Sequence, residues 1–176
     1  MNDVASPELE LQITPVKSIP SDEGVFRLVV RNSTQGTLKV DRLLTVFFHY
    51  SVVTAEGETL DPVYNELAEP AVPAELAERF VALEPGQTLE REFSLLKKER
   101  VFEALKIWEG GDERWVGSER LYQYQPRGSV RVRVSYSPGV AGSGAFYACF
   151  GVSPARQGIF LGRSGSNTLL LTVEGD

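Results

Sequence analysis

The chain has 176 residues, 42% of them hydrophobic, and a net charge of −6 with an isoelectric point near 5.0. This composition predicts a single folded domain over residues 1–176 and disfavours nonspecific binding to nucleic acid or to an anionic membrane. One histidine, His49, and one cysteine, Cys149, exclude an intramolecular disulfide and leave too few ligands for a zinc site. We therefore expect no metal and no cofactor.

Short runs of alternating apolar and polar residues predict antiparallel strands along the whole chain. The clearest run is Val130–Val134, in which valine and arginine alternate, so the valines would face a core and the arginines the solvent. Turn residues such as Gly, Pro and Asn separate the runs. Strands are expected over residues 9–13, 25–31, 38–40, 45–54, 58–60, 80–83, 89–95, 115–116, 121–124, 130–136, 145–152 and 167–173.

Two segments depart from the strand pattern. Residues 61–79 contain three prolines among glutamates and alanines, which predicts a long crossover connection that could hold one helical turn. Residues 97–108 place Val101, Phe102, Leu105 and Trp108 at helical spacing, and the glycine pair after them would end a helix. We therefore predict an all-β fold, an immunoglobulin-like two-sheet antiparallel sandwich with one short inserted helix.

Three turn-containing passages carry a resemblance to known proteins. They are Val29–Val40, with its Asn-containing turn, Leu83–Leu89, with its Pro-Gly turn, and Ser166-Asn167 before the last strand. Together they resemble a group of immunoglobulin-like sandwiches that includes the bacterial intracellular proteinase inhibitor family and accessory domains of some secreted metalloendopeptidases. The resemblance implies the sandwich fold and suggests protease inhibition, for which the loop 137–144 is the candidate.

Two surfaces are candidate binding sites. Arg131 and Arg133 project from the same side of one strand and could hold carboxylates or phosphates, although a solvated outer face, or pairing with Glu90 and Glu92, is the commoner arrangement. Residues 127–176 carry five arginines and only two acidic residues, against the acidic balance of the whole chain. Trp108 and Trp115 flank a glycine-containing loop that would bind a partner if both were exposed, whereas burial of both in the core is the favoured interpretation.

No group of residues has the pattern of a catalytic site. His49 lies on a mixed face of its expected strand and Cys149 has no cation beside it, so we expect neither to act in catalysis. The 24 acidic residues offer many possible pairs for a hydrolase, but the sequence singles none out, and neither Glu56, Glu58 and Asp61 nor Asp112 and Glu113 have the spacing of a known calcium loop. We therefore expect the protein not to be an enzyme.

The expected function is non-catalytic binding of another protein, as an adaptor, an inhibitor or a component of a larger assembly. The alternatives are a carbohydrate or small-ligand site on a sheet face bearing Tyr122, Tyr124 and Tyr136, and a hydrolase that uses acidic residues alone. An edge strand could also mediate a homodimer. The first eight residues show no signal peptide and no apolar run is long enough to span a bilayer, so we expect a cytoplasmic protein, or one whose leader was removed.

Overall fold

The structure is a computed structural model that describes residues 8–16, 24–70, 78–138 and 158–173, and β-strands make up almost all of the regular secondary structure of these residues. The predicted all-β class is confirmed. The strands are β1 (Leu9–Pro15), β2 (Val25–Asn32), β3 (Leu38–Asp41), β4 (Phe48–Thr54), β5 (Tyr64–Pro70), β6 (Phe80–Leu83), β7 (Thr88–Ser94), β8 (Glu99–Glu109), β9 (Asp112–Gln123), β10 (Gly128–Tyr136), β11 (Ser164–Gly165) and β12 (Leu169–Val173).

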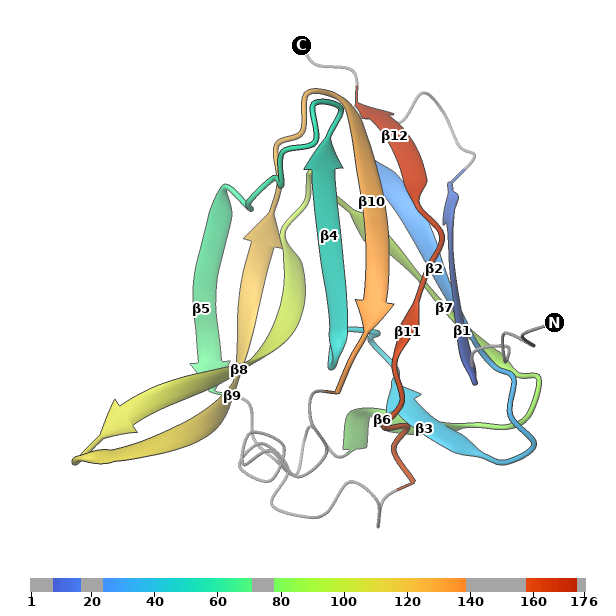
Figure 1. Ribbon diagram of the computed structural model, residues 1–176. Helices are drawn as coiled ribbons and strands as arrows, with labels where there is room; N and C mark the ends of the chain where they lie inside the picture. Colours follow the sequence, from blue (N-terminus) through green and yellow to red (C-terminus); the bar gives the residue numbers. More distant parts are fainter. Residues whose placement is uncertain (1–7, 17–23, 71–77, 139–157, 174–176) are drawn as a thin grey trace, which may run out of the picture.

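The described strands pair antiparallel in four sheets (Figure 1). The first sheet has the order β1-β2-β7. In the second sheet, β10 pairs with β4 on one edge and with β11 and β12 on the other. The third sheet has the order β5-β9-β8, and the short strands β3 and β6 form a fourth.

The first and second sheets share one hydrophobic core. The alternation in β10 does what the sequence predicts, because Val130, Val132 and Val134 are buried while Arg131 and Arg133 are exposed. Aromatic rings join the sheets, since the Tyr50 ring of β4 lies 4.7 Å from Phe93 of β7 and 6.2 Å from Phe26 of β2. Burial raises the pKa of Tyr50 well above its usual value, and its hydroxyl donates a 2.6 Å hydrogen bond to the Leu44 carbonyl. This phenol therefore stays neutral.

Side-chain hydrogen bonds connect β1 of the first sheet to the β11–β12 edge of the second sheet. The Asn167 side chain accepts from the Ile13 N–H at 2.8 Å and donates to the Ile13 carbonyl at 2.9 Å. The Ser164 hydroxyl donates to the Leu9 carbonyl. These side chains satisfy backbone groups at the edge of β1 that none of the described strands covers.

The predicted helix over residues 97–108 is wrong. These residues lie largely in β8, which pairs with β9 as far as Glu109 opposite Asp112. Gly110 and Gly111 have φ angles of 64° and 92°, the left-handed conformation that a two-residue hairpin turn requires. The glycine pair therefore reverses a strand instead of ending a helix, and pairing with β9 outweighs the helical spacing of the apolar residues.

Other expected boundaries differ in detail. The strand expected from residue 45 begins at Phe48, because Leu44 and Phe47 have positive φ angles and belong to a turn. The crossover expected over residues 61–79 contains β5, and β9 is one strand instead of two short ones. The strand expected over residues 145–152 lies outside the described residues.

A buried ion pair holds the turn before β4. The carboxylate of Asp41 is fully buried and accepts bonds from Nε and Nη2 of Arg79 at 3.1 and 2.9 Å. It also accepts from the backbone N–H groups of Thr45 and Val46 at 3.0 and 2.8 Å. Nη1 of Arg79 donates to Glu119 of β9, so the pair also connects the third sheet to the rest.

We predict that Asp41→Asn lowers the free energy of unfolding by about 3 kcal/mol or more, because it leaves the Arg79 guanidinium without its main counter-charge in the interior. Urea unfolding followed by circular dichroism measures this loss. The control is Glu92→Gln, which removes an exposed partner of Arg27 at 2.8 Å and should cost no more than about 1 kcal/mol. Similar losses in both variants would contradict the prediction.

The same carboxyl makes stability depend on pH. Burial acts to raise the pKa of Asp41, but the hydrogen bonds and charge of Arg79 and the bonds from Val46 and Thr45 prevail, so the pKa lies below its usual 3.8. The stabilisation is therefore complete above pH 3.8 and is lost as the pH falls through the lower folded-state pKa. Between pH 5 and pH 2, we expect wild-type stability to fall more steeply than that of Asp41→Asn in thermal melts.

Candidate binding surfaces

The first candidate surface is the outer side of the second sheet, which we call the arginine face: Ser51, Val53, Arg131, Arg133 and Leu170. Register places Arg131 between Val53 of β4 and Leu170 of β12, and it places Arg133 opposite Ser51. Leu170 is 64% exposed, which is unusual for a large apolar side chain. The arginine face therefore combines two cations with an apolar neighbour.

Neither arginine of this face has a carboxylate partner within the described part of the chain. Nη2 of Arg131 makes only long contacts of 3.5 and 3.4 Å to the carbonyls of Thr54 and Ala55. Arg133 has no hydrogen bond or ion pair there, and Gly165 lies beside its guanidinium, where a Cβ would come within 3.0 Å of Nη2. Both guanidinium groups keep donors for a ligand.

The expected alternative, pairing with Glu90 and Glu92, is wrong. These carboxylates lie on β7 in the first sheet, where Arg27 of β2 contacts Glu92 at 2.8 Å and Glu90 at 3.9 Å. Arg31 of the same strand lies 4.0 Å from Glu10. Carboxylates on the outer side of the first sheet thus balance the charge of the arginines there, whereas the arginine face has no described carboxylate that does so.

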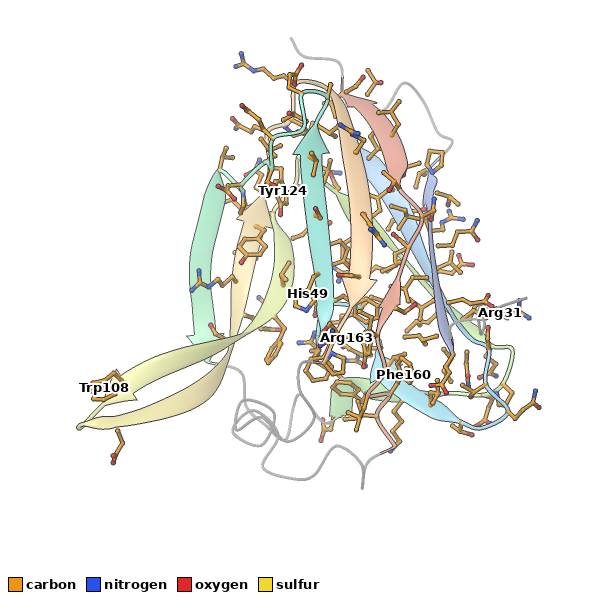
Figure 2. The ribbon with its side chains drawn as sticks, viewed as in Figure 1. Arg31, His49, Trp108, Tyr124, Phe160 and Arg163 are labelled. Carbon is orange, nitrogen blue, oxygen red and sulfur yellow. The ribbon has the colours of Figure 1, made fainter. Side chains whose placement is uncertain are left out.

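The second candidate surface is the hairpin tip, formed by Trp108, Gly110, Gly111 and Asp112. Strand β5 pairs with β9 only from Gln123 to Ser118, so the end of the hairpin is a two-stranded arm that projects away from the first two sheets (Figure 1). Trp108 lies near its end (Figure 2) and is 70% exposed. The favoured interpretation of Trp108 as a core residue is wrong, because no sheet covers this part of the arm among the described residues.

Trp115 is part of the same arm. It pairs with Lys106 through the backbone of β9, and its side chain lies outside the described part of the structure. Of the two candidate tryptophans, only Trp108 therefore has a described side chain, and that side chain is exposed.

We predict that Trp108→Phe changes the free energy of unfolding by less than about 0.5 kcal/mol, because the side chain has little packing to lose. Fluorescence quenching by iodide or acrylamide should lose its most accessible component in this variant. A destabilisation of more than about 1 kcal/mol would contradict the prediction and show that the Trp108 ring is packed against other residues.

The remaining candidates supply no catalytic arrangement. His49 is exposed on the outer side of β4, and its Nε2 lies 3.3 Å from the Ser137 carbonyl. Cys149 and most of the loop 137–144 lie outside the described residues. No group of three His, Cys, Asp or Glu side chains in the described chain could hold a metal ion.

The tyrosine face proposed for carbohydrate binding does not exist as predicted. Tyr136 is fully buried and its hydroxyl donates to the Phe160 carbonyl at 2.7 Å, while Tyr122 and Tyr124 are only partly exposed.

Leu170 was not among the predicted site residues. Its alternation with the buried Leu171 in β12 is the pattern that places its side chain on the outer side of the sheet.

No protein-family model and no curated protein matches the chain. The search for membrane spans, limited to the described residues, found no helix of sufficient length and apolar character.

Proposed function

We propose that this protein is a non-catalytic protein-binding module that presents the hairpin tip to its partner. The observation that carries the proposal is the 70% exposure of Trp108 on a projecting two-stranded arm. Tryptophan is enriched among the residues that dominate binding energy, because its large surface is desolvated on contact.

We also propose that the framework is an immunoglobulin-like sandwich. Its two sheets would be β1-β2-β7 and β4-β10-β12, which share one core and are antiparallel throughout. This order supports the proposal, because immunoglobulin-like domains set the first, second and fifth strands of their scheme against the third, sixth and seventh. The β8–β9 hairpin would then be an addition between the fifth and sixth of these strands, at a place where sandwiches carry variable loops.

The experiment replaces Trp108 by the photo-cross-linker p-benzoylphenylalanine and irradiates the full chain in a lysate of its native source. We expect one recurrent protein to be cross-linked at this position and identified by mass spectrometry. The matched control places the cross-linker at Val63, which is similarly apolar and 59% exposed but lies before β5. The same set of proteins at both positions would contradict a specific contact at the hairpin tip.

The captured protein also gives a quantitative test. Trp108→Ala should weaken its affinity by about 30-fold, the effect of losing about 2 kcal/mol at a dominant contact residue. Val63→Ala should bind as the wild type does. Equal affinity of Trp108→Ala and the wild type would remove the hairpin tip from the binding surface.

A further inference from the structure

We propose that the arginine face binds an extended acidic segment of a partner protein, with carboxylates at alternate residues of that segment. The inference rests on the protein-binding function proposed above and adds the chemistry that the partner must supply. The arginine face lies on the second sheet and not at the hairpin tip. An experiment can therefore contradict one of the two proposals without contradicting the other.

The two sheets differ in the charge left on their outer sides. Each arginine of the first sheet has a carboxylate partner: Arg27 lies 2.8 Å from Glu92, Arg31 lies 4.0 Å from Glu10 and Arg91 lies 3.1 Å from Glu99. Arg131 and Arg133 lie side by side on a central strand without one. Two neighbouring like charges on a sheet repel each other, and a carboxylate ligand between or beside them removes that cost.

The spacing of Arg131 and Arg133 along β10 matches that of an extended peptide. Alternate residues of a strand lie about 6.6 Å apart on one side, and an extended peptide repeats the same distance. A segment that runs along β10 would therefore bring the carboxylates of residues i and i+2 to Arg131 and Arg133. Each guanidinium can hold one carboxylate through two parallel N–H···O bonds, which favours a carboxylate over a less directional anion.

Small neighbouring residues leave the arginine face accessible to a ligand. Ser51 and Ser135 are small, and Gly165 carries no side chain beside the Arg133 guanidinium. Val53 and the exposed Leu170 flank Arg131 and offer apolar contact to the aliphatic part of an acidic side chain. The arginine face is thus open beside one cation and apolar beside the other.

The negative net charge of the protein disfavours a long polyanion as the ligand of the arginine face. The whole chain carries a net charge of −6, which disfavours binding of nucleic acid. A short acidic segment can contact the two arginines without approaching the acidic remainder of the surface.

The test measures fluorescence anisotropy of labelled peptides with the full chain. The probe is Glu-Thr-Glu-Thr-Glu, and the comparison peptide Glu-Glu-Thr-Thr-Glu has the same composition but no two carboxylates at residues i and i+2. We expect the alternating peptide to bind about tenfold more tightly, and its binding to weaken as salt rises from ~0.05 to ~0.5 M. Equal affinity for the two peptides would overturn the proposal.

A charge exchange tests the residues themselves. Arg131→Glu/Arg133→Glu should bind the acidic peptide about tenfold or more weakly and should instead bind Lys-Thr-Lys-Thr-Lys. The matched control, Arg42→Glu/Arg127→Glu, reverses two other exposed arginines and changes the net charge equally, from −6 to −10. It should bind the acidic peptide as the wild type does, and an equal loss in both variants would mean that only net charge matters.

Two further measurements separate the alternatives. Anionic phosphatidylserine vesicles should not bind the wild type more than they bind Arg131→Glu/Arg133→Glu, and a difference without peptide binding would assign the face to a membrane and overturn the proposal. Trp108→Ala should bind the acidic peptide normally. The peptide assay therefore tests the arginine face whatever the outcome of cross-linking at the hairpin tip.

Discussion

The buried pair of Asp41 and Arg79 is the interaction on which the arrangement of the other elements depends. Asp41 ends β3 and Arg79 precedes β6, and the backbone N–H groups that bind the carboxylate belong to the turn before β4. That turn contains two residues with positive φ, Leu44 and Phe47, a conformation that costs energy and persists because the carboxylate holds it. Through Glu119, the same guanidinium positions β9 and therefore the hairpin that bears Trp108.

The first two sheets differ in whether the arginines on their outer sides have carboxylate partners among the described residues. The outer side of the first sheet pairs Arg27 with Glu92 across adjacent strands, as expected for a surface that faces only water. The arginine face has the same strand geometry and no such partner among the described residues, although the chain as a whole is acidic. A fold of net negative charge that leaves two adjacent cations unpaired has the electrostatic complement of an acidic ligand.

The alternation of apolar and polar residues predicted most strands. It failed where contacts between residues far apart in the sequence determine the structure. The alternation of β10 fixes which side chains are buried, because strand geometry acts over neighbouring residues. Asp41 and Arg79 are 38 residues apart, and nothing in the sequence marks them as partners. The helix predicted over residues 97–108 failed because β9 supplies pairing along the whole of β8, and the glycine pair allows both interpretations. Leu170 was predictable from its buried neighbour Leu171, whereas the exposure of Trp108 depends on where β5 ends.

The unequal support of the β8–β9 hairpin is a structural reason for proposing that its tip binds a partner. Beside β5, β9 has a partner on both edges, but beyond Ser118 the arm has only two described strands. An isolated two-stranded ribbon has little stability of its own in water, so its end gains the most from contact with another surface. The arginine face, in contrast, belongs to a strand paired on both sides and backed by the main core. A partner that contacted both the arginine face and the hairpin tip would bind one preformed charged surface and one exposed tryptophan on an adaptable arm. Because the arginines lie on a rigid sheet, less conformational entropy would be lost on binding.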